Sequence, residues 1–344
     1  MADIKALVAG ANPMMRKKLC NAIAMSGSGI TVIAEASDLP ETYTRAEAME
    51  PRVVLVAKEL VALAEFSLMK SLFRALNSIW ITVDHRGVGP NALPDFARGS
   101  NEIGVPVLDT GLGAAEICRQ IIAAASMAAQ PLPPRDLAVP LAAGSIKPGK
   151  LILLGASTGG VDALLAVLAA LPANCPPVAV VQHTGQGFSE SLIRLLARRC
   201  TLRVEAAQHG MELKSGVVAV AAGCAAHMRL RSGAPYRISL EPGPLISGHL
   251  PSVDALFHSA VPIGKHVVAG LLTGMGRDGA EGLLALRKAG AATVGQDESS
   301  SVVYGMPRAA WEIGAVRQQV PLSDIAATIV KACATRGVEG RVLL

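Results

Sequence analysis

The stretch from Leu151 to Leu171 constrains the fold more than any other part of the chain. It opens with an aliphatic run, passes through Gly155-Ala156-Ser157-Thr158-Gly159-Gly160 and continues with apolar residues at helical spacing from Asp162. This order predicts a buried strand, a tight turn and a helix. Ser157 lies in the turn, at the carboxyl edge of the predicted sheet and beside the backbone N–H groups of the next helix. Because such groups stabilise a developing anion, Ser157 is a candidate nucleophile.

Three other interpretations of this turn compete with a nucleophile. It can be a plain strand-to-helix connection. Gly-Ala-Ser-Thr-Gly also resembles the nucleotide turn that opens short-chain dehydrogenases. However, Val161 stands where the dinucleotide fingerprint has its third glycine, and no tyrosine is followed by a lysine four residues later. The third alternative, an α/β-hydrolase elbow, requires the chain order serine, acid, histidine, which the partners found below do not follow.

Length and composition limit the class of protein. The 344 residues suggest two domains of ordinary size, and 51% hydrophobic residues with only 17% charged residues exclude disorder for most of the chain. Neither a signal peptide nor an unbroken apolar run of ~20 residues is present, so we expect a cytoplasmic protein without membrane insertion. The six cysteines show no metal-ligand spacing, which predicts reduced thiols, no disulfide framework and no metal: Cys20, Cys118, Cys175, Cys200, Cys224 and Cys333.

Charge is unevenly distributed along the chain. Residues 1–130 carry a net charge of −1 and residues 131–344 a net charge of +6. The basic residues of the second part are dispersed, apart from Arg198-Arg199 and the pair Arg229 and Arg231, and no aromatic residues alternate with them. This pattern argues against nucleic acid as a partner. An ordinary solvated face explains it, and a basic face that attracts an acidic protein substrate is the alternative.

A compositional boundary divides the chain. Residues 130–149 are rich in proline and glycine and lack periodicity, which is typical of a linker. We therefore expect a first domain at 1–129, a linker at 130–149 and a second domain at 150–344. In the first domain, helical patterns separate five short strands, which predicts a parallel α/β sheet: Lys5 to Ala9, Thr31 to Ala34, Val53 to Val56, Ile79 to Val83 and Val105 to Leu108.

This layout resembles the receiver domain of response regulators, as does Leu7-Val8-Ala9 followed by Met14-Met15-Arg16. Receivers hold Mg²⁺ with an acidic pair after the first strand and accept phosphate on an aspartate after the third. Those places here are Gly10-Ala11 and Ala57. Receivers also pair the acceptor with a hydroxyl residue and a lysine; here Thr82 is nearest to the hydroxyl position, and Asp109 follows the fifth strand. Phosphoryl transfer needs a metal and an acceptor oxygen. The sequence therefore predicts a pseudo-receiver that is neither phosphorylated nor Mg²⁺-dependent.

Two further strand ends of the second domain carry candidate partners for Ser157. His183 ends the apolar run Pro177 to Gln182, and Asp278 follows the apolar run His266 to Thr273 in a glycine-rich turn. Each residue alone has a simple structural explanation, as a polar group at a sheet edge or as a helix cap. Together they provide the base and the orienting carboxylate that a serine nucleophile needs.

Five motifs, in order, resemble the catalytic domain of the chemotaxis protein-glutamate methylesterases, the CheB family. The match covers roughly residues 150–330, and the receiver, linker and esterase layout is also that of the family. The motifs are Gly-Ala-Ser-Thr-Gly-Gly at 155–160, Val-Val-Gln-His at 180–183, Gly-His-x-Pro-Ser-Val-Asp at 248–254, Leu-Thr-Gly-Met-Gly-x-Asp-Gly-Ala at 272–280, and Gln-Asp-Glu-x-Ser with Val-Tyr-Gly-Met-Pro-Arg-Ala-Ala at 296–310. The resemblance implies an N-terminal receiver-like (flavodoxin-like) parallel sheet and a C-terminal doubly wound parallel α/β methylesterase domain.

The resemblance also implies roles for particular residues. Ser157 would be the nucleophile, His183 the general base and then acid, and Asp278 its orienting carboxylate. Thr158 and the backbone at Met275 would line the site and stabilise the oxyanion. The implied reaction is hydrolysis of glutamyl γ-methyl esters on methyl-accepting chemotaxis receptors, with deamidation of receptor glutamines as a second activity. This reaction requires neither a metal nor another cofactor.

Two departures from the family bear on substrate fit and regulation. Thr184-Gly185-Gln186 follows His183 where the family commonly has Met-Pro-Pro. In the family, phosphorylation of the receiver uncovers the active site, so a pseudo-receiver implies constitutive activity or control by a regulatory protein bound to it. The alternative function is a non-catalytic signalling adaptor that binds a partner through the pseudo-receiver. His249, Ser252 and Asp254 lie in a matched motif, and we assign them no catalytic role.

Overall fold

A computed structural model of the chain describes residues 4–63, 66–76, 78–84, 107–127, 147–185, 188–231, 233 and 235–334. The chain divides into two compact units, Met1–Pro134 and Arg135–Leu344. Of the predicted linker at 130–149, residues 130–146 lie outside the described part, as does Gln186. Among the described residues, every helix is too short or too polar to cross a membrane.

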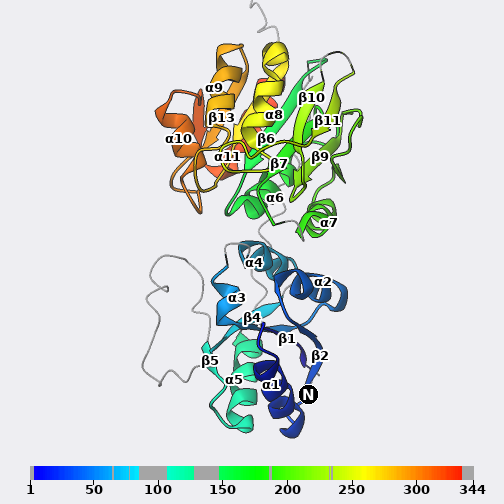
Figure 1. Cartoon of the computed structure of the whole chain (residues 1–344), viewed down its shortest axis with the longest axis vertical. Helices are drawn as coiled ribbons and strands as arrows, with labels where there is room; N and C mark the ends of the chain where they lie inside the picture. Colours follow the sequence, from blue (N-terminus) through cyan, green and yellow to red (C-terminus); the bar gives the residue numbers. More distant parts are fainter. Residues whose placement is uncertain are drawn as a thin grey trace, which may run out of the picture. The chain divides into compact units, whose positions relative to one another are not determined.

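The first unit contains a five-stranded parallel sheet in the order β2-β1-β3-β4-β5. Helices α1 and α5 pack together, and so do α2 and α4, on the two faces of the sheet (Figure 1). This strand order is that of flavodoxin-like folds, so the predicted receiver-like fold is confirmed. The elements are β1 (Ile4–Ala9), α1 (Pro13–Met25), β2 (Ile30–Ala36), α2 (Leu39–Met49), β3 (Val53–Ala57), α3 (Lys58–Val61), α4 (Phe66–Ala75), β4 (Ile79–Asp84), β5 (Val107–Asp109) and α5 (Ala114–Met127).

The second unit contains a seven-stranded sheet in the order β14-β13-β12-β6-β7-β9-β8. All its pairings are parallel, and a separate antiparallel pair is formed by β10 and β11. The strands are β6 (Leu151–Ala156), β7 (Val178–Gln182), β8 (Arg203–Ala206), β9 (Val217–Ala222), β10 (His227–Arg231), β11 (Arg237–Glu241), β12 (Val267–Leu271), β13 (Ala292–Gln296) and β14 (Gln318–Val320). The helices are α6 (Gly160–Ala170), α7 (Ser189–Arg199), α8 (Val253–Ser259), the 3₁₀ helix Val261–His266, α9 (Ala280–Lys288), α10 (Met306–Glu312) and α11 (Leu322–Cys333).

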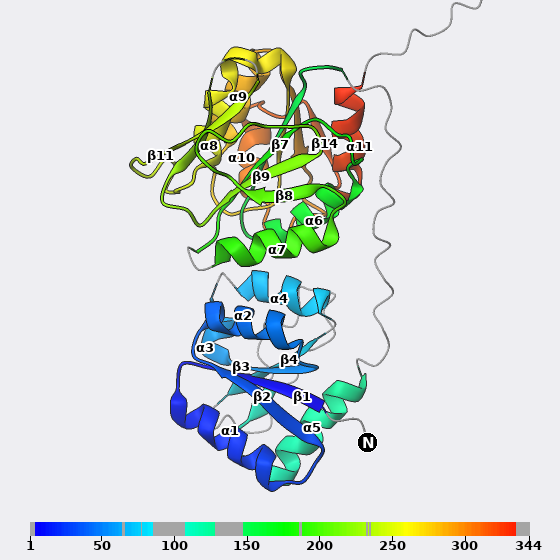
Figure 2. The ribbon, with the colours of Figure 1, turned by 90° about the vertical axis from the view of Figure 1, so that its right-hand side faces the viewer.

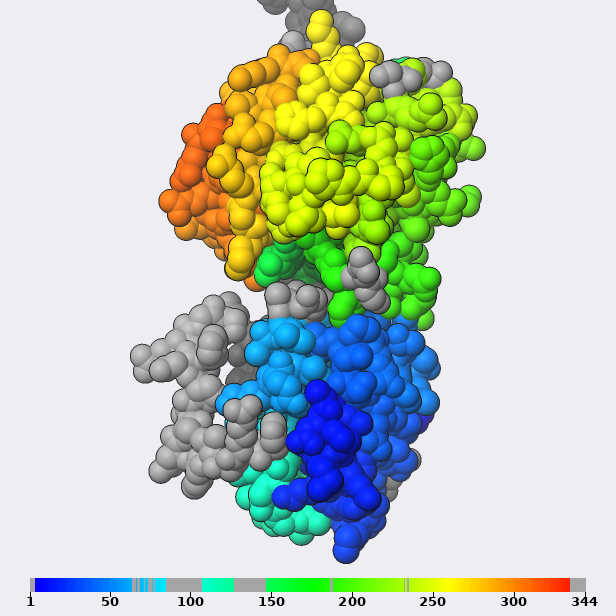
Figure 3. Space-filling view, in the orientation of Figure 1, coloured from blue at the N-terminus to red at the C-terminus, as the bar shows by residue number. Residues whose placement is uncertain are grey.

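Helices cover both faces of this sheet (Figure 2). Helices α6, α7 and α11 pack together on one face, and α8, α9 and α10 on the other. In the orientation of Figure 3, much of the visible surface of this unit comes from the segment between β10 and α8, in yellow-green and yellow. The central strands β6, β7 and β12 are buried along their whole length, as expected for a parallel sheet with two covered faces. The predicted doubly wound parallel α/β domain is therefore confirmed.

The strand order reverses at β6, because the chain leaves β6 for β7 on one side and later returns to β12 on the other. In open α/β sheets, ligands bind outside the carboxyl ends of the strands at such a switch point. The three strand ends that meet there are followed by Ser157, His183 and Asp278. The topology thus brings the three predicted catalytic residues to one edge of one sheet.

The core of the second unit supports β6 directly. Leu153 is fully buried in the cluster between the sheet and the face covered by α8, α9 and α10. We expect Leu153→Ala to lower the free energy of unfolding of this unit by about 2–5 kcal/mol, because it removes buried methyl groups and leaves a cavity. Urea unfolding monitored by Trp311 fluorescence, in a Trp80→Phe background, measures this unit alone.

Leu245 is 64% exposed and provides the matched control for this substitution. The same truncation at Leu245 should change the free energy of unfolding by no more than about 0.5 kcal/mol. Equal losses for the two variants would contradict the assignment of Leu153 to the core.

Candidate active site

Hydrogen bonds fix the backbone of Ser157 between two neighbouring strands. The Ser157 N–H donates to the carbonyl of Thr273, which follows β12, at 3.0 Å. The Ser157 carbonyl accepts from the Gly160 N–H at 2.7 Å and from Gln182 Nε2 at 2.9 Å. Gly274 also approaches closely, since a Cβ built there would lie 2.7 Å from Ser157 Cβ. Only a glycine at 274 leaves room for the serine, so the loops that follow β6 and β12 close tightly around it.

His183 follows β7 directly opposite Ser157. The last register pair of the two strands is Ala156 with Gln182, and the His183 N–H continues the ladder to the Ala156 carbonyl at 3.0 Å. Ser157 and His183 are therefore the next residues along adjacent parallel strands, which lie about 4.8 Å apart.

Only one of the two ring nitrogens of His183 makes a hydrogen bond to a described residue. Its Nε2 lies 2.8 Å from Asp278 Oδ2, and its side chain is 7% exposed. Its Nδ1 is buried and makes no hydrogen bond to any described residue. Catalytic hydrogen bonds are often long in unliganded enzymes and tighten with substrate bound. Nδ1 is thus the nitrogen left free to take a proton.

Asp278 sits on the N-terminus of α8. Its carboxylate accepts from Ser252 Oγ at 2.7 Å and from the N–H groups of Val253 and Asp254 at 2.7 and 3.0 Å. Burial alone would raise the pKa of Asp278, but the hydrogen bonds from His183, Ser252 and Asp254 hold it below its ordinary value. A helix N-terminus also favours a negative charge. The arrangement keeps Asp278 ionised although its side chain is fully buried.

A second carboxylate, on α8, accepts a hydrogen bond from the N-terminus of α9. Asp254, in the first turn of α8, accepts from the Gly282 N–H at the start of α9 at 2.7 Å and from Ser247 Oγ at 3.0 Å. Burial and the neighbouring charge of Asp278 raise the pKa of Asp254. The loop before α9 thus supplies an acid to the N-terminus of α8, and α8 supplies one to α9. These two reciprocal caps fix the position of Asp278.

Comparisons with known proteins place the chain in one family. The family profile described as CheB methylesterase matches residues 152–329. The chain is 36% identical over 346 residues to a protein-glutamate methylesterase/protein-glutamine glutaminase 1 of Caulobacter vibrioides, covering 98% of this chain and 100% of that one. It is also 51% identical over 197 residues to a protein of Gluconobacter oxydans named protein-glutamate methylesterase/protein-glutamine glutaminase, with 56% of each chain covered.

The chain belongs to the CheB methylesterase family. A solved structure agrees: the CheB methylesterase catalytic domain of Thermotoga maritima matches with a TM-score of 0.52 and 33% identity. The match covers 53% of this chain and 98% of that one. The predicted family resemblance is thereby confirmed.

The two predicted oxyanion residues follow Ser157 itself and Gly274, the glycine that approaches Ser157 closely. Thr158 follows Ser157 in the turn, and its carbonyl accepts from Thr273 Oγ1 at 2.9 Å. Met275 follows Gly274, and its side chain is among the most exposed apolar groups, at 67%. Within the described part of the chain, the backbone N–H groups of Thr158 and Met275 donate to no backbone carbonyl. Both N–H groups therefore remain available to a ligand.

A polar framework beneath the site was missed by the sequence analysis. Thr273 Oγ1 joins the loops after β6 and β13, because it donates to the Thr158 carbonyl and accepts from the Val303 N–H at 2.9 Å. The buried Gln296 accepts from the Thr273 N–H at 2.8 Å. Ser252, to which the sequence assigned no catalytic role, caps α8 and also donates a hydrogen bond to Asp278. These roles depend on contacts between strands that no local spacing reveals.

The carboxyl edge of the first sheet differs from a phosphate-accepting site. Ala57 ends β3 and Gly10 follows β1, so neither position provides a carboxylate. A Cβ at Gly10 would lie 2.2 Å from Met15 Cε and 2.8 Å from Ala57 Cβ, because the buried Met15 side chain fills the space above them. Asp84 pairs with Lys58 at 2.9 Å.

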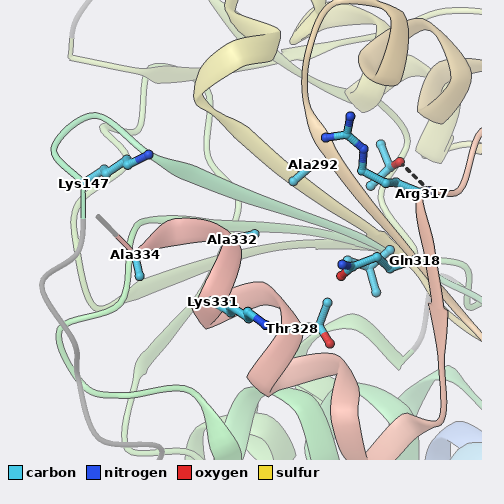
Figure 4. A pocket seen from close by; sticks show the side chains of 10 residues that line it. Lys147, Ala292, Arg317, Gln318, Thr328, Lys331, Ala332 and Ala334 are labelled. Carbon is cyan, nitrogen blue, oxygen red and sulfur yellow. Dashed lines mark hydrogen bonds between the residues drawn. The ribbon is translucent and has the colours of Figure 1, made fainter. Parts of the chain in front are cut away.

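A cavity of about 400 Å³ lies at the opposite edge of the second sheet, beside α11 (Figure 4). Lys147, Arg317 and Lys331 line it, together with residues at the amino ends of β13 and β14. It contains none of the three predicted catalytic residues. Among the described residues, no group of three or more histidine, cysteine, aspartate or glutamate side chains is arranged to hold a metal ion.

We expect Ser252→Ala to lower the free energy of unfolding by about 1–3 kcal/mol near pH 7, because Asp278 loses a charge-assisted hydrogen bond and α8 loses its cap. A carboxylate whose pKa is lower in the folded protein than in the unfolded chain stabilises the folded state at pH values above its unfolded-state pKa, which is about 4. This contribution is lost as the pH falls through the folded-state pKa. The difference in free energy of unfolding between the wild type and Ser252→Ala should therefore become smaller below about pH 4.

Urea unfolding as a function of pH measures this deficit. The exposed Ser323→Ala is the matched control, and its free energy of unfolding should stay within about 0.5 kcal/mol of the wild-type value. A deficit for Ser252→Ala that is independent of pH would mean that Ser252 acts only as a helix cap.

Proposed function

We propose that this chain is a protein-glutamate methylesterase that hydrolyses glutamyl γ-methyl esters on methyl-accepting chemotaxis receptors. One observation carries the proposal: His183 is held by a buried, ionised Asp278 and presents a free Nδ1 one strand away from Ser157. This arrangement is that of an activated serine nucleophile. The names of its full-length relatives support the substrate class.

The proposed reaction proceeds in two steps through an acyl-enzyme. Ser157 Oγ attacks the ester carbonyl while His183 Nδ1 takes its proton, and methanol leaves with the proton returned by His183. A water molecule, deprotonated by His183, then attacks the acyl-enzyme and releases glutamate and Ser157. Asp278 stabilises the imidazolium at Nε2 in both steps, since it is the only ionised group in hydrogen-bond contact with that ring among the described residues.

The oxyanion of each tetrahedral intermediate would be stabilised by the N–H groups of Thr158 and Met275. Thr158 directly follows Ser157 in the chain. Met275 directly follows Gly274, and Gly274 is the residue that approaches Ser157 closely. Preorganised backbone donors of this kind contribute about 10²–10³-fold to the rate of acyl transfer. The exposed Met275 side chain can contact the substrate in the same position.

Deamidation of receptor glutamines uses the same residues. An amide is the harder substrate, because its leaving nitrogen must be protonated by His183 as it departs. Relatives of this chain carry both activities in their names. We propose the glutaminase activity as a second reaction of the same site.

We propose that the receiver-like unit is not phosphorylated and that the enzyme, in the cytoplasm, is either constitutively active or controlled by a protein bound to this unit. The acceptor position is Ala57, and Met15 fills the space in which an acidic pair would bind a metal. The alternative is a non-catalytic adaptor. The intact set of Ser157, His183 and Asp278 argues against it, because a scaffold released from catalysis would have no reason to keep all three polar groups at strand ends.

Ser157→Ala should reduce methanol release from methylated chemoreceptor membranes by at least ~10³-fold, because it removes the nucleophile. The assay contains no phosphodonor, and Ser323→Ala, an exposed serine far from the proposed site in sequence, should release methanol at the wild-type rate. A Ser157→Ala variant as active as the wild type would exclude this mechanism.

A second comparison separates two reasons for inactivity. If the full chain releases no methanol, the assay is repeated with residues 1–145 deleted. Release by the shortened chain would mean that the receiver-like unit restrains the enzyme until a partner binds. No release by either would mean that the substrate is not a receptor.

Beryllofluoride with Mg²⁺ should not bind to the receiver-like unit, because no carboxylate is available at Gly10, Ala11 or Ala57. Ala57→Asp should not restore binding, since it adds the acceptor but neither the acidic pair nor the space occupied by Met15. Isothermal titration with a phosphorylatable receiver as positive control measures this, and tight binding to the wild-type chain would contradict the pseudo-receiver.

A further inference from the structure

A second histidine lies flat against the ring of His183. The ring centroids of His183 and His249 are 3.7 Å apart and their planes differ by 9°. The contact leaves the edge of His183 free, so Nε2 still reaches Asp278 and Nδ1 remains without a partner among the described residues. The proposed mechanism assigns no role to His249.

The backbone holds His249 rigidly in this place. The N–H groups of Ile246 and His249 each donate to the carbonyl of the other, at 3.1 and 2.9 Å. The two residues between them, Ser247 and Gly248, have φ values of 50° and 82°, which is typical of a type I′ turn. Ser247 Oγ then anchors this turn to Asp254 on α8 at 3.0 Å. The turn that carries His249 and the carboxylate that holds His183 are therefore fixed by the same helix.

The orientation of His183 needs such a support. The torsion that turns an imidazole about its Cβ–Cγ bond is broad and weakly restricted. The hydrogen bond to Asp278 fixes one nitrogen but allows the ring to rotate about that contact. A parallel ring at 3.7 Å blocks this rotation on one face.

His249 is also suited to lie beside a base that becomes positively charged. Burial, and then repulsion from His183 whenever that ring is protonated, lower the pKa of His249, although Asp278 acts in the opposite direction. A neutral ring packs against an imidazolium without the repulsion that a second positive charge would add.

We infer that His249 is a positioning residue whose ring fixes the plane of the His183 imidazole, so that Nε2 keeps its bond to Asp278 while Nδ1 stays free to act as the base for Ser157. The inference rests on the proposed esterase, because it assigns His183 as the base for Ser157. His249 acts through His183 and contacts no reacting atom.

Substitution of His249 tests whether the flat ring or its nitrogens matter. His249→Ala should lower kcat for methanol release by about 10–100-fold with KM changed less than about threefold, because small displacements of a catalytic group have effects of this size. His249→Phe keeps a flat ring without nitrogen atoms and should retain kcat within about threefold, since stacking alone is required. His266→Ala, an exposed histidine at the other end of β12, is the matched control and should leave both parameters unchanged.

The same variants are also measured by the rate at which a fluorophosphonate labels Ser157, a reaction that needs no receptor. His249→Ala should slow labelling by the same factor as kcat, and His249→Phe should not. Wild-type rates for His249→Ala, or equal losses for the two variants, would overturn the inference. If His249→Ala does not fold, His249→Phe decides the matter alone, since a loss of more than tenfold would show that the nitrogens are needed.

This experiment also separates the inference from the proposed function. Methanol release that survives Ser157→Ala, or is absent in the wild type, would refute the esterase assignment. Labelling of Ser157 would then still report whether His249 orients His183.

Discussion

The buried charge of Asp278 is the constraint on which the rest of the second unit depends. A carboxylate without exposure to water requires several donors, and here they come from His183, Ser252 and the first two N–H groups of α8. Those donors must converge on one point, so the ends of β7, β12 and α8 are fixed relative to one another. The same requirement places Asp254 against α9, and the two helices are locked as a pair.

The parallel sheet explains why this convergence is possible. Each of the three central strands ends in a loop at the same edge of the sheet. Because the strand order reverses at β6, two of those loops diverge there and leave room for a ligand between them. Long buried side chains along the strands provide rigidity, while Gly274 lets the loop after β12 approach Ser157 closely. The residues that stabilise the fold and the residues of the proposed site therefore lie on different parts of the same strands. The aliphatic residues lie along the body of each strand, and the polar residues lie at its carboxyl end.

Much of this architecture could be predicted from the sequence. Continuous aliphatic runs identified the central strands, and the polar residue after each run identified Ser157, His183 and Asp278 as candidates, because strand ends meet at one edge. Sequence could not tell which nitrogen of His183 faces Asp278, since that depends on the direction from which α8 approaches. Nor could it show that Met15 fills the space above Gly10 and Ala57 in the first unit, because that contact depends on how α1 packs on the sheet.

The reciprocal caps imply an order in which this catalytic unit can lose its activity during evolution. Ser157 contributes its hydroxyl to no structural hydrogen bond among the described residues, so a lineage released from selection for hydrolysis can replace it at little cost. Asp278 is tied to two helices and a histidine, so its replacement would damage the fold itself. Inactive descendants of such an enzyme should therefore keep the aspartate long after the serine has gone, and the surviving aspartate would mark their ancestry.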